Sequence, residues 1–505
     1  MTYLHTSRIL LLAVIPFMVA ACSTETGETI ANGNSNDVND ERNTLLNGEE
    51  NSGVTASGYF DEQTLSGIYD LFSEYDRDNA PGCAAAIYKD GRAVFAEGFG
   101  MANLDHDIPL SDSSRFYMAS VSKQVTAAAA GLLIVRGELD YDARVSDYLD
   151  DWPEWAEDVR VKHLFNHTSG LPDIYDLMEI SGISLSNVMD VDDYMSVFYS
   201  AESLKNRPGS SYSYTNSGYT ALAGLIEKIS GESFSSFVEE HLLKPLGMTS
   251  THFHDDRLRV IPDRVISYAP KGDTNSGSGD GNDQDADSEE NRLPPFRQTY
   301  LSNFQGVGPG GLYSTLKDWQ KWEYFWMEGN DLPSEFADLK QLLIRQEKVD
   351  GDTLEYALGL DVTTWQGMRK EGHSGNFMGF KTDVRRFPES GYAFLTLCNR
   401  EDADPGEKNR EMTRIVLKEP IEAFLKSYSG SYHNEELEVD YKLTVEDASL
   451  KLNRRLSPGG AMTEDEKDKW SAGSWEFVFR RDDDQGITGF VVSTGRAREV
   501  EFIRR

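Results

Sequence analysis

Two segments of the chain carry a serine and a lysine at the same spacing: Ser120–Lys123 (Ser-Val-Ser-Lys) and Ser314–Lys317 (Ser-Thr-Leu-Lys). On a helix this spacing puts the hydroxyl and the amine on one face, where the amine can take the hydroxyl proton and activate the serine as a nucleophile. A helix N-terminus also offers unpaired N–H groups to an oxyanion, and burial of the lysine favours its neutral, basic form. The spacing alone does not say which copy carries this chemistry.

The residues that follow each copy distinguish them. After Lys123 the chain is almost wholly apolar up to Val135, and Gly137 provides a stop signal, so we expect a buried helix over Ser120–Arg136. After Lys317 the run DWQKWEYFW is amphipathic and partly charged, which predicts a surface helix capped by Ser314. We therefore favour Ser120 as the nucleophile and interpret the second copy as structural.

Two further groups of polar residues follow in the chain. Tyr214 and Asn216 stand just before a predicted helix over Tyr219–Gly231, and side chains two residues apart in an extended segment project the same way. His373-Ser374-Gly375 opens a predicted strand, where the glycine would let a substrate approach the backbone. The nearby Lys381-Thr382-Asp383 lacks such a glycine, so we discount it.

With these motifs in this order, the chain resembles the serine penicillin-recognising family of class C β-lactamases, D-Ala-D-Ala carboxypeptidases and related esterases and D-aminopeptidases. The resemblance covers about residues 60–425. It extends to Leu164–Leu171 (LFNHTSGL) and Gly310–Thr315 (GGLYST), which look like the family's connecting segments. It implies an α+β, β-lactamase/transpeptidase-like fold, with an antiparallel sheet flanked by helices plus an all-helical subdomain.

The resemblance also implies roles for individual residues. Ser120 would be the nucleophile, Lys123 the base and Tyr214 the group that passes protons to the leaving group. The residues implied in substrate binding are Asn216, His373, Ser374, Gly375 and Asn376. The backbone N–H groups of Ser120 and Asn376 would form the oxyanion hole, and no metal or organic cofactor is implied.

One departure from the family pattern bears on the substrate. Many relatives have a lysine, in Lys-Thr-Gly, where this chain has His373, and a histidine is mostly neutral near pH 7. This weakens a cation that would attract a substrate carboxylate, and favours the aminopeptidase and esterase branches. Our leading hypothesis is an exported serine hydrolase that cleaves an ester or amide bond, such as that of a D-amino-acid peptide, through an acyl-Ser120 intermediate. The alternatives are a β-lactamase or D-Ala-D-Ala carboxypeptidase, and a catalytically silent protein that binds peptidoglycan or another ligand.

The first 22 residues have the proportions of a secretory signal peptide, with Arg8 before an apolar run that is too short to span a bilayer. Their end, Val-Ala-Ala-Cys22, resembles the lipobox of bacterial lipoproteins. We expect Cys22 to be acylated and the protein to be a membrane-anchored lipoprotein, periplasmic or on the cell surface; the alternative is an ordinary cleaved signal. Residues 23–57 are polar, Asn- and Gly-rich, and read as a disordered tether.

With 85 acidic and 49 basic residues, the 505-residue chain has a net charge of −36, which disfavours binding to nucleic acid. We interpret residues 272–291 as a flexible acidic insertion, with a calcium loop as the alternative. His252, His254 and Asp256 match the start of a metallo-β-lactamase zinc site, but no further ligand cluster follows, so we favour turn or surface residues. His163 and His167 are interpreted as structural, His167 by bonding the turn at Ser169-Gly170.

Alternating apolar residues predict the remaining elements. A hairpin over 82–99 and strands over 377–386 and 391–399 would form one sheet from both ends of the chain, with helices over 234–243 and 406–426. These elements fill a predicted domain of residues 58–426, followed by a small all-β, barrel-like domain of residues 427–505. Cys83 and Cys398 lie in strand-like runs, as two buried thiols or, if the strands are neighbours, as a disulfide. The sequence does not indicate the oligomeric state.

Overall fold

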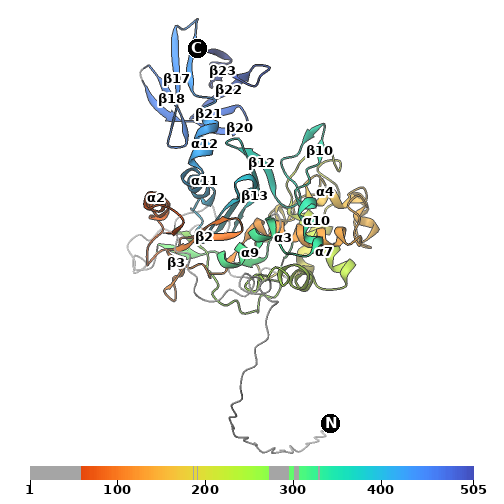
Figure 1. Ribbon diagram of the computed structural model, residues 1–505. Helices are drawn as coiled ribbons and strands as arrows, with labels where there is room; N and C mark the ends of the chain where they lie inside the picture. Colours follow the sequence, from red (N-terminus) through yellow and green to blue (C-terminus); the bar gives the residue numbers. More distant parts are fainter. Residues whose placement is uncertain are drawn as a thin grey trace, which may run out of the picture. The chain divides into compact units, whose positions relative to one another are not determined.

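The computed structural model describes residues 58–505, except residues 186, 190, 272–294, 301–305, 328–329 and 456 (Figure 1). The predicted signal peptide with Cys22, the tether of residues 23–57 and the acidic insertion of residues 272–291, with its calcium alternative, lie outside the described residues. Among the helices of the described part, none is both long and apolar enough to cross a membrane.

The central element is a six-stranded antiparallel sheet in the order β12-β13-β14-β15-β1-β2. Its strands are β1 (Cys83–Lys89), β2 (Arg92–Phe99), β12 (Asp361–Trp365), β13 (Met368–Phe377), β14 (Phe380–Phe387) and β15 (Tyr392–Cys398). The pairing of β1 with β15 joins the two ends of the domain, as the strand pattern predicted. The predicted strand over 377–386 in fact begins at Phe380, because Met378 and Gly379 have positive φ angles of 42° and 81° and form a turn.

Side chains alternate along β1 between two hydrophobic cores, one on each face of the sheet. Helix α9 (Leu316–Trp326) packs on one face, and α11 (Pro405–Val416) packs on the other, next to α2 (Glu62–Phe72). Cys83 and Cys398 face each other in the β1–β15 register and form a disulfide. The pairing that the sequence left open is therefore a bridge between neighbouring strands.

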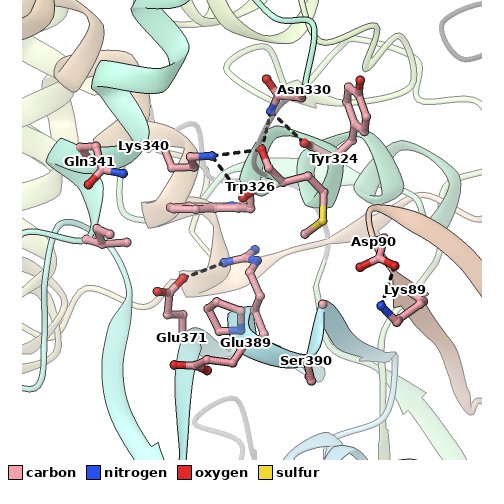
Figure 2. A pocket seen from close by; sticks show the side chains of 15 residues that line it. Lys89, Asp90, Tyr324, Trp326, Asn330, Lys340, Gln341, Glu371, Glu389 and Ser390 are labelled. Carbon is pink, nitrogen blue, oxygen red and sulfur yellow. Dashed lines mark hydrogen bonds and ion pairs between the residues drawn. The ribbon is translucent and has the colours of Figure 1, made fainter.

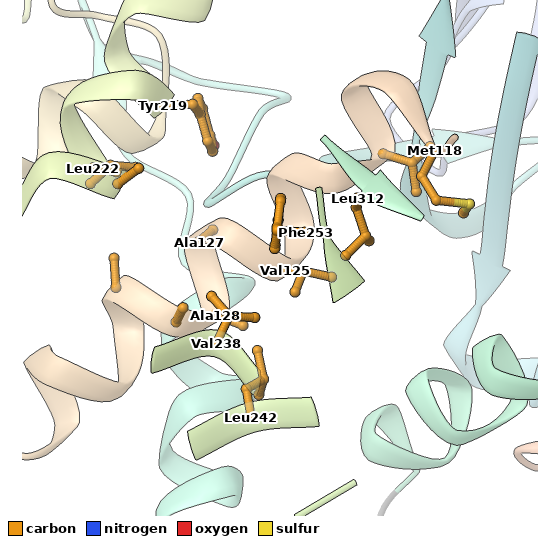
Figure 3. Close-up of a cluster of buried hydrophobic side chains, with 14 of the residues drawn as sticks. Met118, Val125, Ala127, Ala128, Tyr219, Leu222, Val238, Leu242, Phe253 and Leu312 are labelled. Carbon is orange, nitrogen blue, oxygen red and sulfur yellow. The ribbon is translucent and has the colours of Figure 1, made fainter. Parts of the chain in front are cut away.

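The buried helix predicted from the sequence is α3 (Ser122–Val135), which follows a 3₁₀ turn, η2 (Ala119–Val121). Residues of α3 are buried on all sides from Ser122 to Leu133, in contact with α7 (Asn216–Ser230) and α10 (Ser334–Leu343). Figure 3 shows Val125, Ala127 and Ala128 of this helix among apolar side chains of other elements. Ser120 itself lies in the 3₁₀ turn, which corrects the prediction of one regular helix over Ser120–Arg136.

Smaller helices surround α3 and α7. They are α4 (Val161–Phe165), α5 (Ile174–Ile180), α6 (Val191–Tyr199) and α8 (Phe234–Val238), which continues as the π-helical turn η5 (Glu239–Leu243). Helix α7 begins three residues earlier than predicted because the Thr215 side chain caps it, accepting a hydrogen bond from Ser217 N.

The prediction for the helix after the second Ser-x-x-Lys copy was wrong in two respects. Thr315, not Ser314, is the N-cap of α9, since its side chain accepts a hydrogen bond from Asp318 N. The helix is also largely buried, because its aromatic side chains pack in the core and its charged Glu323 is buried against Arg386. Charge in a sequence therefore does not place a helix at the surface when the charge has a buried partner.

The C-terminal region forms a nearly closed, nine-stranded antiparallel sheet in the order β19-β18-β17-β16-β24-β23-β22-β21-β20. Its strands are β16 (Gly430–Asn434), β17 (Val439–Glu446), β18 (Ser449–Arg454), β19 (Ser457–Ala461), β20 (Thr463–Glu466), β21 (Lys469–Ala472), β22 (Trp475–Arg481), β23 (Ile487–Ser493) and β24 (Val500–Arg504). Buried aromatic residues such as Trp470 and Phe490 fill it. This barrel-like sheet confirms the predicted fold class, and it follows helix α12 (Lys418–Leu425).

Candidate active site

A small three-stranded sheet holds the turn that carries Ser120. Its strands are β5 (Phe116–Tyr117), β9 (Leu312–Ser314) and β6 (His252–Phe253). Met118 N donates to Leu312 O at 2.8 Å, and Gly311 N donates to the Tyr117 hydroxyl at 3.0 Å. Ala119 has a φ of 48°, a conformation that costs a residue with a side chain about 1–3 kcal/mol and that clusters at functional sites. The surrounding contacts thus hold Ser120 in a strained turn at the start of a buried helix.

Lys123 joins three segments that are far apart in the chain. Its Nζ lies 3.1 Å from Ser120 Oγ and donates hydrogen bonds to Asn216 Oδ1 at 2.8 Å and Pro309 O at 3.0 Å. The side chain is fully buried, with 0% of its surface exposed. Burial lowers the pKa of Lys123 to about 7, against a smaller upward effect of the Asp173 carboxylate. A large fraction of Lys123 is therefore neutral at physiological pH and able to accept a proton from Ser120.

Asn216 is fixed by a carboxylate. Asp173 Oδ2 accepts hydrogen bonds from Asn216 N at 2.6 Å and from Asn216 Nδ2 at 2.9 Å, while Asp173 Oδ1 caps helix α5. The amide nitrogen of Asn216 is thus engaged, and its oxygen is turned toward Lys123. This arrangement orients the lysine and leaves Asn216 little freedom to rotate.

Tyr214 lies over the same lysine. The Lys123 ammonium nitrogen is 4.9 Å from the centre of the Tyr214 ring, and the Tyr214 side chain is 37% exposed. Burial raises the pKa of Tyr214, and a side-chain hydrogen bond to Ser120 acts in the opposite direction. The phenol therefore stays protonated at neutral pH, beside both the serine and the lysine and at the solvent side of the site.

The His167 ring packs against the Tyr214 ring, with 4.2 Å between the two ring centres. Its Nδ1 accepts a hydrogen bond from Thr215 N at 3.2 Å, not from the turn at Ser169-Gly170 as predicted. Burial, together with the positive charge of Lys123, holds the pKa of His167 well below its usual range. His167 is thus a neutral, buried ring that positions the Tyr214 segment.

His373 is also neutral. Burial and the nearby Lys123 lower the pKa of His373 to about 3, and its Nε2 lies 2.9 Å from the hydroxyl of Tyr356. It lies in the middle of β13, whereas the sequence predicted that it opens a strand. A residue in the family's lysine position therefore carries no positive charge here at neutral pH.

Within the described residues, strand β13 has a stretch of edge without a strand partner next to the nucleophile. Its pairing with β12 ends at Gly372, whereas its pairing with β14 continues to Phe377. Along this stretch Ser374 and Asn376 are exposed, while Gly375 is buried. An extended substrate could pair with this edge, as strands accept added peptides in other proteins.

Gly375 has a packing role that the sequence did not suggest. A Cβ atom there would lie 2.9 Å from both Ala119 Cβ and Met118 O, and closer still to Thr382 Oγ1. The missing side chain lets the Ser120 turn approach β13, so Ser120 and Asn376 each lie one residue beyond this contact. The predicted pair of backbone N–H donors thus comes from two segments in direct contact.

The structure brings together all eight residues singled out for catalysis or substrate binding, on η2, α3, α7 with its preceding segment, and β13. The other candidates lie elsewhere. Lys317 is an exposed partner of Asp112, Lys381 pairs with Glu401, and His163 accepts a hydrogen bond from Arg160 N. His252 and His254 are buried, not at the surface, and within the described residues no three His, Cys, Asp or Glu side chains form a group that could hold a metal ion.

Sequence reasoning missed three contributors: Asp173, Tyr356 and the carbonyl of Pro309. Asp173 had a usable signal, since an aspartate after a proline and before an apolar run is a typical N-cap. Tyr356 and Pro309 had none, because no local pattern marks them as partners of His373 and Lys123, which lie 17 and 186 positions away.

This geometry, a serine beside a buried lysine with a tyrosine and an asparagine above it, defines a serine hydrolase of the β-lactamase and penicillin-binding-protein type. Residues 68–417 match the β-lactamase family model, and the chain belongs to this family.

Curated relatives agree with this class. The chain is 27% identical over 359 residues to a penicillin-binding protein of Bacillus subtilis (strain 168), covering 70% of this chain and 74% of that protein. It is 26% and 29% identical to D-aminopeptidases of Gluconobacter oxydans and Brucella anthropi, covering 64% of this chain. The matches span 56% of the length of each of these D-aminopeptidases.

Solved structures show the same fold. The penicillin-binding protein homologue from Pyrococcus abyssi superposes with a TM-score of 0.57 at 20% identity and covers 88% of this chain and 100% of that chain. D-amino acid amidase from Ochrobactrum anthropi, complexed with D-phenylalanine, gives a TM-score of 0.56 at 19% identity and covers 71% of this chain and 99% of that chain.

Proposed function

We propose that this serine hydrolase cleaves an amide or ester bond that follows an N-terminal D-amino-acid residue, through an acyl-Ser120 intermediate. The observation that carries the proposal is the contact of Lys123 Nζ with Ser120 Oγ at 3.1 Å, together with a lysine pKa near 7. A nucleophile and a base at this distance, with the base half neutral at working pH, can form a covalent intermediate without a metal or cofactor.

In the first half-reaction the neutral Lys123 takes the Ser120 proton while Oγ attacks the substrate carbonyl carbon. The backbone N–H groups of Ser120 and Asn376 stabilise the oxyanion, as preorganised donors do in acyl transfer. Tyr214 passes the proton to the leaving amine or alcohol, and an ester of Ser120 remains. In the second half-reaction a water molecule gives a proton to Lys123 through Tyr214 and attacks the ester carbonyl. The ester bond to Ser120 then breaks, Lys123 returns the proton to Ser120 Oγ, and the acid is released with the neutral lysine restored.

The preference for an N-terminal D-residue rests on charge and on the relatives. A neutral His373 offers no cation to a substrate carboxylate, which disfavours D-Ala-D-Ala carboxypeptidase and penicillin substrates. Several relatives bear the name D-aminopeptidase. A substrate with a free amine at one end and no carboxylate near the scissile bond fits both observations.

A substrate panel tests this preference. Purified protein is assayed with D-alanine and L-alanine p-nitroanilides, a short-chain p-nitrophenyl ester, a D-Ala-D-Ala peptide and nitrocefin. We expect turnover of the D-anilide above the L-anilide, turnover of the ester, and little turnover of the two carboxylate-bearing substrates. Faster turnover of nitrocefin or of the D-Ala-D-Ala peptide would instead establish the β-lactamase or carboxypeptidase alternative.

A labelling experiment separates any hydrolase from a silent binding protein. A fluorophosphonate should add one label to the wild-type chain by intact mass, and Ser120→Ala should remove it. Labelling that persists in Ser120→Ala rejects the nucleophile, whereas absence of labelling and of turnover in the wild type supports the binding-protein alternative.

We also propose that Cys22 is acylated and anchors the exported protein to a membrane, because the sequence before it resembles a lipobox. In a bacterial host, radiolabelled palmitate should be incorporated into the wild type and not into Cys22→Ala. Incorporation into the variant would reject Cys22 as the acylated residue.

A further inference from the structure

A pocket of about 720 Å³ has a lining that is separate from the Ser120 site (Figure 2). It is bounded by the end of α9, by α10, and by the paired residues Glu371 of β13 and Arg386 of β14. None of the residues proposed for catalysis or substrate binding lines it. The volume falls within the range of pockets that hold small molecules, about 300–1,000 Å³.

Two buried nitrogen atoms of this pocket lack hydrogen-bond partners among the described residues: Trp326 Nε1 and Arg386 Nη1. Trp326 is 6% exposed and Arg386 is 2% exposed. Buried donors without acceptors are rare in folded proteins, because each has lost its water without a replacement. Two of them in one pocket therefore indicate an acceptor that the described residues do not supply.

The remaining contacts of Arg386 show why its Nη1 is left over. Its Nε and Nη2 donate to the two carboxylate oxygens of Glu323 at 2.7 and 2.8 Å. Nη1 forms only a long ion pair with Glu371 Oε2, at 3.8 Å, which is beyond hydrogen-bond length; the other oxygen of Glu371, Oε1, pairs with Arg369 Nε at 2.9 Å. Two of the three guanidinium nitrogens are thus hydrogen-bonded to Glu323, while Nη1 has only the long ion pair to Glu371.

The two donors are close to each other, and a second cationic group lines the same pocket. The Arg386 guanidinium stacks over the Trp326 ring, with its central carbon 4.4 Å from the ring centre. Lys340 also lines the pocket, and its Nζ donates to Met327 O at 3.0 Å and to Trp326 O at 3.5 Å (Figure 2). An indole, a guanidinium and an ammonium group therefore line the same pocket.

We propose that this pocket binds a small organic carboxylate through Trp326, Arg386 and Lys340. A carboxylate offers two oxygens with several lone pairs, and its hydrogen bonds to arginine and lysine are charge-assisted. The acidic side chains of Asp90, Glu371 and Glu389 also line the pocket, and they repel a doubly charged phosphate more strongly than a singly charged carboxylate. Met327 lines the pocket as well, and its flexible side chain can move to admit a ligand to the buried donors.

The indole N–H signals of the full chain, which has 8 Trp residues, provide a direct test. Protein labelled with ¹⁵N-tryptophan is titrated with benzoate, N-acetyl-alanine, benzamide and inorganic phosphate, and the Trp326 signal is assigned as the one lost in Trp326→Phe. We expect a saturable downfield shift of the Trp326 indole proton with the carboxylates. The neutral benzamide should bind about tenfold more weakly, because it lacks the charge.

Two variants make the test specific. Trp326→Phe keeps a ring under the guanidinium but removes the donor, so calorimetry should show benzoate binding about 2- to 10-fold weaker. Trp322→Phe, on the same helix but outside the pocket, should bind as the wild type does.

Binding of benzoate alone points to free aromatic acids, and binding of N-acetyl-alanine as well extends the ligand class to peptide C-termini. No saturable shift with either carboxylate, or equal benzoate binding by Trp326→Phe and the wild type, overturns the proposal.

Discussion

The chain contains the same four-residue pattern twice, and the two copies lie in opposite environments. In the first, Ser120 and Lys123 are 3.1 Å apart and the lysine is fully buried. In the second, the side chain of Lys317 is 64% exposed and pairs with Asp112 at 3.2 Å, while Ser314 Oγ lies 2.9 Å from Thr251 Oγ1. The spacing of residue types therefore does not create a catalytic pair.

The backbone around each copy explains the difference. Ser120 lies in a 3₁₀ turn that runs directly into α3, so the serine and lysine stay on one side of a continuous helical segment. Ser314 ends strand β9, and the helix begins only after the Thr315 cap, so Ser314 is turned toward its neighbour strand and Lys317 toward solvent. A reactive lysine also needs burial, and Lys123 is buried whereas Lys317 faces solvent, although most of α9 is buried.

The sharpest test of this comparison replaces the serines. Ser120→Ala should lower kcat/KM by at least ~10,000-fold, since removal of a nucleophile abolishes the covalent route. Ser314→Ala should stay within about twofold of the wild type in kcat/KM. Steady-state kinetics on the best substrate of the panel, with circular dichroism to verify folding, measures both. A large loss in Ser314→Ala would mean that the second copy takes part in the chemistry.

Replacing the lysines should give the next largest difference. Lys123→Ala removes the base, which typically costs ~100- to 10,000-fold, and Tyr214→Phe should fall in the same range because it removes a proton-transfer group. Lys317→Ala serves as the matched control and should retain full activity. If Lys123→Ala kept more than a tenth of the wild-type kcat/KM, another group would have to be the base.

The sequence predicted the elements whose signals are local. The buried helix after Ser120 follows from its apolar composition, and the sheet built from both chain ends follows from strands at Cys83–Lys89 and Tyr392–Cys398. The barrel-like C-terminal sheet was visible as alternating apolar residues between turn signals. The pattern that predicts each of these helices and strands lies within about ten residues, which is the range over which periodicity is informative.

The parts of the site that the sequence did not reveal depend on contacts between distant residues. Lys123 and Pro309 are 186 positions apart, and nothing near Pro309 marks its carbonyl as a lysine partner. His167 was assigned to a nearby turn but bonds Thr215, 48 positions away, because the fold brings α4 and α7 together. The surface assignment of α9 failed for the same reason: Arg386, the partner that buries Glu323, lies 63 positions away.

A substitution of Gly375 tests whether the close approach of β13 to the Ser120 turn distinguishes the first copy from the second. Gly375→Ala would push a methyl group against Ala119 and Met118, and displacement of a catalytic group by about 1 Å can cost ~100-fold. We expect kcat to fall by about that factor, with little change in the melting temperature of the protein. Gly460→Ala, at a glycine where an added Cβ meets nothing, is the control. Equal activity of the two variants would show that the contact does not position Ser120.

The pH profile tests the pKa that burial gives to Lys123. The lysine acts as a base only when neutral, so kcat/KM should rise with pH up to about 7 and then level off, falling about tenfold per pH unit below that value. His373 does not contribute to this limb, because its pKa is near 3 and it stays neutral throughout. Rates measured from pH 5 to 9 with the neutral ester substrate would contradict this account if the midpoint lay near 10.

The smallest expected effect belongs to the second copy and concerns stability, not activity. Thr315 caps α9 through its bond to Asp318 N, and loss of such a cap costs about 1 kcal/mol of unfolding free energy. Thr315→Ala should therefore lower the denaturation midpoint slightly and leave kcat/KM unchanged, whereas Thr315→Ser, which can still accept the bond, should restore most of the stability. Urea titrations of the three proteins, with activity measured on the same samples, separate the outcomes. A fall in kcat/KM for Thr315→Ala under conditions where the protein is fully folded would tie the α9 cap to the reaction and remove the contrast between the two copies.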